Sequence, residues 1–225
     1  MKHPAGYRLF HVMAIVFVTT LLVSNTIAVK VIQVWSFTLP AGILVFPVAY
    51  IFGDVLTEVY GYQRTRSVIW WGFFCLAVMS GFYYLASVLP PAAFWHDQAP
   101  FARLFGLVPR IAVSSFVAYL IGEFLNSTVL SKLKVRTGGR HFWLRAVSST
   151  IVGQGADSVV FNLGAFAGIF PLPVVLFIAF SGFVLKSLYE VIALPLTYAV
   201  VMYVKRYEGV DVYDKGISYT PFKLE

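Results

Sequence analysis

Six long apolar runs dominate the sequence, and most polar residues gather in the short stretches between them. Each run is long enough to cross the hydrocarbon core of a membrane, which takes about 20 residues in an α-helix. An open backbone structure of any other kind leaves its hydrogen-bonding groups unsatisfied in lipid, so we predict helices. The predicted spans are residues 8–30, 38–60, 67–89, 107–130, 147–169 and 173–204, followed by a cytoplasmic tail at 205–225.

The composition indicates an integral membrane protein. Of the 225 residues, 59% are hydrophobic and only 12% are charged, and the mean hydropathy is +0.80. This balance excludes an ordinary soluble domain. The first apolar run, from Val12 to Val29, is longer than the apolar part of a secretory signal, so we predict a retained helix. The expected fold is a single all-α domain.

The basic residues predict the orientation in the membrane. The formal net charge is +7, but the Lys and Arg residues cluster in connectors and form no basic stripe that would indicate direct nucleic-acid binding. Thirteen of the 17 lie in the N-terminal segment, the second and fourth connectors and the tail, and three lie on the opposite side. The excess of positive charge on the cytoplasmic side of membrane proteins therefore places both termini in the cytoplasm.

Several charged residues lie within or at the ends of the predicted spans. A charge at mid-bilayer costs at least about 2.5 kcal/mol, so such residues usually face a cavity or a partner. They are Asp54, Glu58, Glu123, Asp157, Lys186 and Glu190 within spans, and Lys30 and Arg110 near the outer ends. Asp54 and Glu58 are four residues apart on one helix face, where two carboxylates repel unless a cation, a shared proton or a ligand lies between them.

Other polar residues form stripes at helical spacing. Gln154, Asp157 and Ser158 share one face of the fifth span, with Asn162 one turn further on, and Asn25 belongs to a polar group on the first. A lipid-facing helix would not carry such a stripe. Two interpretations stay open, a cavity that holds a polar guest and a hydrogen-bond network without a ligand. Lys186 and Glu190, also four apart, are explained equally well as a structural ion pair or as part of a ligand site.

The sequence does not support catalysis, a metal or a cofactor. All four histidines lie near the chain ends or in connectors, so no histidine dyad or zinc site can form at mid-membrane. No GxxxxGK[ST] motif is present, so the chain itself does not hydrolyse nucleotide.

Prolines and glycines indicate where helices begin, bend and approach one another. Pro40, Pro171 and Pro173 are best explained as residues at helix starts, whereas Pro195 predicts a kink near a cavity. Gly164 and Gly168 are spaced for close packing within the bundle.

One motif resembles a known family. The run from Gly53 to Tyr62, with Arg64 and Arg66 after it, resembles the signature of the queuosine precursor transporter family, the former vitamin uptake transporter-like group. Further similarity covers nearly the whole chain: Ser24, Asn25, Ala28 and Lys30, then Gln154 and Asp157, then Lys186, Glu190 and Pro195.

The resemblance implies uptake across a bacterial inner membrane of a 7-deazaguanine, either 7-cyano-7-deazaguanine or its aminomethyl relative, for queuosine synthesis in transfer RNA. It also implies a fold similar to the substrate-binding components of energy-coupling-factor importers. A carboxylate can accept both donors of a guanine-like edge. The candidates for that role are Asp54, Glu58, Asp157 and Glu190; Asn25, Gln154 and Asn162 are candidates for the other ring atoms, and Lys30 and Lys186 for charge neutralisation.

Three alternatives remain open at this point: a substrate-binding subunit of an ATP-driven vitamin or nucleobase importer, an intramembrane enzyme, and a structural protein. The expected partners are the small-molecule substrate and membrane lipid. Coupling to protons, a homo-oligomer and the identity of the carboxylate that contacts the ligand are left undecided.

Overall fold

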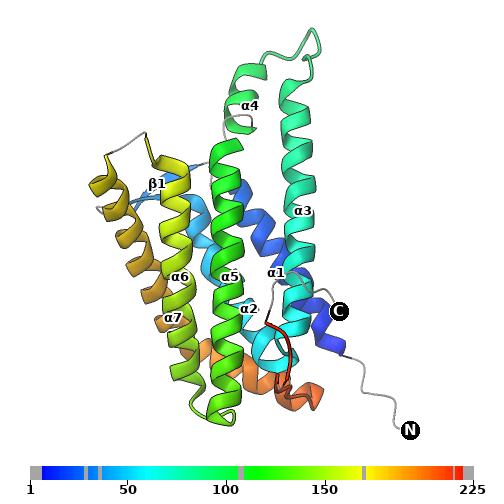
Figure 1. Cartoon of the computed structure of the whole chain (residues 1–225). Helices are drawn as coiled ribbons and strands as arrows, with labels where there is room; N and C mark the ends of the chain where they lie inside the picture. Colours follow the sequence, from blue (N-terminus) through cyan, green and yellow to red (C-terminus); the bar gives the residue numbers. More distant parts are fainter. Residues whose placement is uncertain are drawn as a thin grey trace.

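The structure is a computed structural model, and it describes residues 7–27, 30–34, 37–105, 109–168, 171–214 and 216–219. Within these residues the chain is almost entirely helical (Figure 1). The long helices are α1 (Arg8–Ile27), α2 (Phe46–Tyr60), α3 (Tyr62–Val88), α5 (Pro109–Thr137), α6 (Phe142–Phe166) and α7 (Leu172–Glu208). The short elements are β1 (Val31–Val34), β2 (Phe37–Pro40), the 3-10 turn η1 (Ala41–Leu44) and α4 (Gln98–Phe105).

Each predicted span corresponds to one long helix, but the second begins later than expected. α2 starts at Phe46 rather than at 38, because β2 pairs antiparallel with β1, with Val31 opposite Pro40. β-Branched residues favour this extended pairing, and Pro40 disfavours helical backbone in the residue before it. With 15 residues, α2 is about 22 Å long, less than the roughly 30 Å of a hydrocarbon core.

α2 lies at the centre of the bundle, where it packs against α1, α3, α5 and α7. α5 and α6 form an antiparallel pair, and α7 runs beside α6 (Figure 1). The β1–β2 hairpin and α4 lie at one end of the bundle. The α5–α6 turn, the end of α7 and the segment after it lie at the other, which we call the termini end.

Apolar side chains cover the outside of the bundle, and polar side chains lie inside it. Trp71, Phe177 and Ile192 are 63%, 71% and 70% exposed, whereas Glu123 and Gln154 are fully buried. This distribution is the reverse of that in a soluble protein and suits a lipid environment. By length and apolar composition, α1, α3 and residues Leu172–Tyr189 of α7 can each cross a membrane. The chain is therefore an integral membrane protein.

Glycines bring α5 and α6 unusually close together. A Cβ added at Gly153 would lie 2.8 Å from the carbonyl oxygen of Gly122, so neither position has room for a larger residue. Gly164 likewise packs against Ser114 of α5, as predicted for the interior of the bundle. Gly168 does not pack in this way: it lies beyond the end of α6 with a φ of 79°, and a Cβ there would meet nothing within 4 Å.

Two carboxylates near the C-terminus bind the N-terminal ends of other helices. The first N–H groups of a helix have no partner within the helix and attract negative charge. Glu208 accepts hydrogen bonds from the backbone N–H groups of Arg8, at 3.2 Å, and of Leu9. Asp214 accepts from the N–H of Tyr62 at 2.9 and 3.1 Å. The beginnings of α1 and α3 are thereby fixed at the termini end.

Candidate functional site

Five polar residues from three helices meet inside the bundle, and we call them the interior polar layer: Asp54 of α2, Glu123 and Asn126 of α5, and Gln154 and Asp157 of α6. Each is at most 5% exposed. The two residues from α5 are three positions apart, as are the two from α6, so each pair shares one helix face. Asn126 of α5 reaches Asp54 of α2, whereas Asp157 of α6 reaches Lys186 of α7.

Hydrogen bonds satisfy only part of this layer. The side-chain nitrogen of Asn126 donates to Oδ1 of Asp54 at 2.8 Å. The Asn126 side-chain oxygen has no hydrogen-bond partner among the residues that the structure describes, and the same holds for Oγ of Ser158 and the side-chain oxygen of Asn162. A buried polar atom left without a partner costs about 1–3 kcal/mol. Several such atoms in one region indicate a place where a water or a ligand can bind.

Asp157 forms an ion pair across the α6–α7 interface. The Nζ of Lys186 lies 2.6 Å from its Oδ2, and the Lys186 side chain is 18% exposed. Lys186 thus neutralises a carboxylate of the neighbouring helix. Glu190, predicted as a partner of Lys186, lies on α7, but its side chain is outside the described part of the structure.

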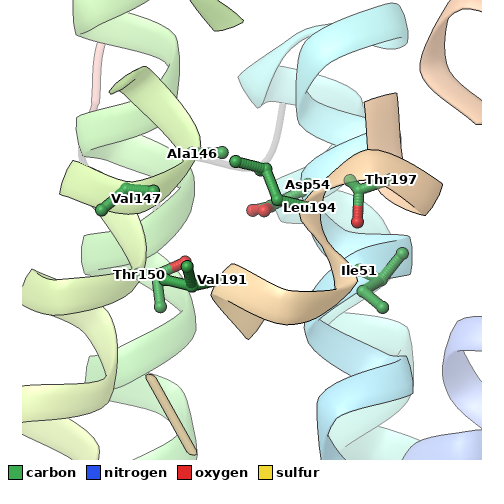
Figure 2. A pocket seen from close by; sticks show the side chains of 8 residues that line it. All are labelled: Ile51, Asp54, Ala146, Val147, Thr150, Val191, Leu194 and Thr197. Atoms are coloured by element: carbon green, nitrogen blue, oxygen red, sulfur yellow. The ribbon is translucent and has the colours of Figure 1, made fainter. Parts of the chain in front are cut away.

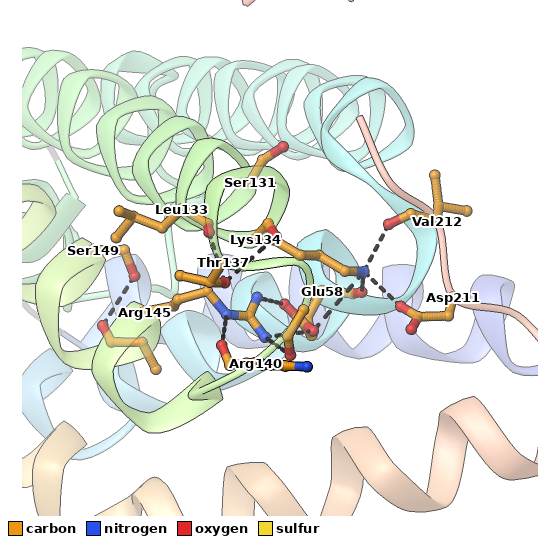
Figure 3. A network of polar contacts seen from close by, with 12 residues as sticks. Glu58, Ser131, Leu133, Lys134, Thr137, Arg140, Arg145, Ser149, Asp211 and Val212 are labelled. Carbon is orange, nitrogen blue, oxygen red and sulfur yellow. Dashed lines mark hydrogen bonds and ion pairs between the residues drawn. The ribbon is translucent and has the colours of Figure 1, made fainter. Parts of the chain in front are cut away.

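At the termini end, Glu58 belongs to a second group of charged residues, which we call the Glu58 cluster. Its members are Glu58, Lys134, Arg145, Lys205 and Asp211, and all but Lys205 are labelled in Figure 3. Arg145 donates two hydrogen bonds to the Glu58 carboxylate, one of them from Nη2 at 3.0 Å. The Nζ of Lys205 lies 2.6 Å from Oε1 of Glu58, and that of Lys134 lies 3.8 Å from it. Three cations therefore surround one buried carboxylate.

Asp211 extends this cluster into the segment that follows α7. It binds Lys134 at 2.6 Å and Lys205 at 3.0 Å. Burial alone would raise the pKa of Asp211, but the hydrogen bonds and charges of the two lysines outweigh it and hold the pKa below its usual value. Lys134 also donates to the backbone oxygens of Glu58 and Val212. The cluster thus joins α2, α5, α6 and α7 across the termini end.

A small cavity lies between α2, α6 and α7, next to Asp54 (Figure 2). Its walls are Ile51 and Asp54 from α2, Ala146, Val147 and Thr150 from α6, and Val191, Leu194 and Thr197 from α7. The space open to the centre of a water molecule is about 10 Å³, close to the minimum for a single water. In this conformation the cavity is too small for a purine-sized molecule.

The interior position expected for several candidate residues is confirmed, whereas others lie elsewhere. Asp54, Glu58, Gln154, Asp157 and Asn162 are all buried. Asn25 is half-buried, and its amide donates to the backbone of its own helix at Leu21. Lys30 is exposed beside the β1–β2 hairpin, at the end of the bundle opposite the Glu58 cluster.

Asn126 is a residue of this region that sequence reasoning missed. It follows Glu123 by three positions, so the spacing that revealed the stripe on the fifth span could have revealed this one. In the sequence, Lys134 and Arg145 are charges of a connector and Lys205 is a charge of the tail, and all three indicate only the orientation. No sequence signal connected them to Glu58, because their contacts depend on how the helix ends meet.

Comparison with known proteins identifies the family. A family model described as "Putative vitamin uptake transporter" matches residues 40–200, most of the chain. A "Probable queuosine precursor transporter" of Bacillus subtilis is 30% identical over 78% of this chain and 77% of its own length. The "Queuosine precursor transporter" of Escherichia coli is 27% identical over 64% of this chain and 62% of its own length.

A further "Probable queuosine precursor transporter", from Haemophilus influenzae, is 29% identical over 59% of this chain and 54% of its own length. No solved structure matches the chain. These relatives are named as transporters and not as enzymes. The length of the family match and the identity to the Bacillus subtilis protein lead to one conclusion: this chain belongs to the vitamin uptake transporter family.

Proposed function

We propose that this chain imports a queuosine precursor across a bacterial inner membrane. The substrate is a 7-deazaguanine, such as 7-cyano-7-deazaguanine or its aminomethyl relative. Three relatives named as queuosine precursor transporters support this assignment. It also agrees with the run from Gly53 to Tyr62, which resembles the signature of that family.

The observation that carries the proposal is the interior polar layer. Two of its carboxylates, Asp54 and Asp157, lie buried in a bundle whose outer surface is apolar. Keeping such groups away from water is costly, and in membrane proteins they usually mark a substrate or ion pathway. Asn162 and Ser158 add buried oxygens that lack a partner within the described residues. A flat, polar heterocycle rich in hydrogen-bond donors would satisfy these groups.

The proposed binding region lies between α2, α5, α6 and α7. Asp54, Gln154, Asp157, Asn162 and Lys186 are its proposed contacts, since all are on these helices and face the interior. The Glu58 cluster, one helical turn from Asp54 toward the termini end, is proposed to close the path on that side. Asn25, Lys30 and Glu190 stay predictions from the sequence.

Transport requires this region to open to each side in turn, so the bundle needs two arrangements of similar energy. In the arrangement described here the carboxylates are bound to neighbouring side chains: Asp157 to Lys186 and Glu58 to Arg145. A substrate would replace these contacts with its own hydrogen bonds. The bundle is proposed to cross the membrane six times, with both termini in the cytoplasm.

The test is uptake of labelled 7-cyano-7-deazaguanine into cells that can neither make nor import it. We expect the chain to restore accumulation, and queuosine in transfer RNA to appear with it. Asp157→Asn and Glu58→Gln should reduce uptake per molecule of the protein present in the membrane. Equal accumulation with and without the gene would refute the substrate assignment.

A second measurement addresses the energy source. Purified chain reconstituted in liposomes should equilibrate labelled 7-cyano-7-deazaguanine across the bilayer without any other protein. Failure in liposomes combined with uptake in cells would favour the alternative, a substrate-binding subunit that depends on an energising partner.

A further inference from the structure

The cavity beside Asp54 presents one charged side chain among weakly polar and apolar ones. Asp54 is 5% exposed, and the hydroxyl groups of Thr150 and Thr197 are the other polar side-chain groups in its walls. Ile51, Val147 and Leu194 supply apolar surface around them (Figure 2). In its lining, though not in its present size, the cavity resembles small-molecule sites, in which a few polar groups fix the orientation of a ligand held by apolar walls.

Asn126 fixes the orientation of the Asp54 carboxylate from the side of α5. A carboxylate only accepts hydrogen bonds, so the amide nitrogen of Asn126 faces it, at 2.8 Å from Oδ1. The amide oxygen then points elsewhere, and no described residue donates to it. Asn126 is itself fully buried. The backbone of α6 comes so close to it that a Cβ added at Gly153 would lie 2.9 Å from the Cβ of Asn126, so the Asn126 side chain has little freedom to turn. Asp54 is therefore held in one position before any ligand arrives.

α7 is interrupted by a proline beside the same region. Pro195 lies inside this helix and has no N–H group, so the carbonyl oxygen of Val191, four residues earlier, lacks its usual helical donor. Val191 and Leu194 are both in the cavity wall. The helix is thus weakened next to Asp54, which suits a wall that must move to admit a ligand.

We propose that Asp54, held by Asn126, recognises the donor edge of the 7-deazaguanine, namely its ring N1–H and its 2-amino group. The inference rests on the proposed function and deepens it, because it assigns this role to one carboxylate among those in the bundle. Asp54 is the contact residue, and Asn126 is a positioning residue that acts through it. Binding requires the Val191–Leu194 segment of α7 to move outward.

The chemistry of the edge favours a carboxylate in this role. N1–H and the 2-amino group are adjacent donors that a carboxylate accepts side by side, as it accepts the paired donors of a guanidinium. A 7-deazahypoxanthine lacks the 2-amino group and would leave one carboxylate oxygen without its donor. Asp157 suits the role less well, because it is not among the residues that line this cavity and its charge is neutralised by Lys186 at 2.6 Å.

The experiment measures competition against uptake of labelled 7-cyano-7-deazaguanine in cells that express each variant. The two competitors are 7-deazaguanine and 7-deazahypoxanthine, which differ only in the 2-amino group. For the unaltered chain we expect 7-deazaguanine to compete about 5- to 150-fold better, the discrimination that one bidentate contact with a base edge supplies. In Asp54→Asn the preference should fall to within about 2-fold, because the amide offers one acceptor in place of two.

Two further variants separate recognition from folding. Asn126→Ala should raise the KM for uptake and weaken the preference while the maximal rate is retained. If Asp54→Asn does not accumulate in the membrane, Asn126→Ala is the deciding variant. An unchanged KM and an unchanged preference in Asn126→Ala would then overturn the proposal. Asp157→Asn is the matched control, the same substitution at another buried carboxylate, and should keep the full preference even if uptake slows.

Retention of the full preference by Asp54→Asn, or its loss in Asp157→Asn, would overturn the assignment of the donor edge to Asp54. Absence of uptake by the unaltered chain would instead contradict the proposed function. The two failures are therefore distinguishable.

Discussion

The side chain of Arg145 is only 1% exposed, and its guanidinium faces the equally buried carboxylate of Glu58. It also donates to the backbone oxygens of Gly139 and Arg140 in the α5–α6 turn, at 3.1 Å each. One side chain thus connects the central helix to the turn that joins two others. Its contribution to stability comes less from the pair itself than from the cost of leaving Glu58 without it.

Arg145→Met tests this role, since methionine keeps an unbranched apolar stem and removes the charge. We expect the free energy of unfolding to fall by about 3 kcal/mol, the lower end for breaking a buried ion pair, because Lys205 still neutralises Glu58. Thermal unfolding of the purified protein in detergent measures the effect. Arg140→Met is the control: Arg140 is exposed on the same turn, and its replacement should stay within about 0.5 kcal/mol of the unaltered protein. Equal destabilisation by both variants would contradict the role given to Arg145.

The sequence predicts which polar residues of the site are buried, but not which residues they bind. The cost of a charge in lipid was sufficient to place Asp54 and Asp157 inside the bundle. The partners could not be predicted, because Asp157 binds Lys186 from another helix, 29 positions away. Local spacing suggests Glu190 as the partner of Lys186, because the two residues are four positions apart on one helix. Glu58 shows the same limit, as all its cations come from distant segments.

Among the elements, the α5–α6 pair is the most closely packed, and Gly153 explains why. Its missing Cβ would lie 2.8 Å from a backbone oxygen of Gly122, which cannot move aside without shifting the whole helix. Asn126 is part of the same contact: its Cβ would lie 2.9 Å from a Cβ at Gly153, and its amide donates to Asp54 at 2.8 Å. The packing of α5 against α6 and the geometry of the interior polar layer therefore both depend on Gly122 and Gly153.

Gly153→Ala should destabilise the protein by about 1–3 kcal/mol, the usual cost of adding a methyl group to a filled interior. Gly182→Ala is the matched control, because Gly182 lies within α7 and a Cβ there would meet nothing within 4 Å. Alanine favours a helix by up to about 1 kcal/mol over glycine, so this variant should be unchanged or slightly more stable. Thermal unfolding of both proteins decides the matter, and similar shifts in the two would refute the packing argument.

The long helices could be predicted because their apolar length is a local property. The β1–β2 hairpin could not, since Val31, Ile32 and Val34 are apolar and continue the pattern of the first span, while their pairing is decided by β2. For the segment after α7 the sequence predicts only a cytoplasmic tail at 205–225. This segment contacts α3 through Asp214. Gly61, at a φ of 85°, ends α2 and starts α3 anew, so the N–H of Tyr62 has no partner within its own helix and donates to Asp214.

At the scale of the whole molecule, the start of α1 and the end of α7 lie next to each other at the termini end. The N–H of Arg8, where α1 begins, lies 3.2 Å from the carboxylate of Glu208, where α7 ends. A chain that starts and finishes at the same end of a bundle must cross the membrane an even number of times. The six proposed crossings satisfy this condition, and the asymmetry of Lys and Arg predicts that this end faces the cytoplasm.

Reporter fusions test this topology. A fluorescent protein fused after the tail should fluoresce, because it folds in the cytoplasm and not after export through the general secretory route. Alkaline phosphatase, which is active only outside the cytoplasm, should be active when inserted at 90–96, between α3 and α4, and inactive in the α5–α6 turn at 138–140. The opposite pattern at both insertion sites would mean that the α5–α6 turn, and the Glu58 cluster beside it, lie outside the cytoplasm, which would contradict the proposed topology. Disagreement at 138–140 alone would mean that α5, the long helix between the two insertion sites, does not cross.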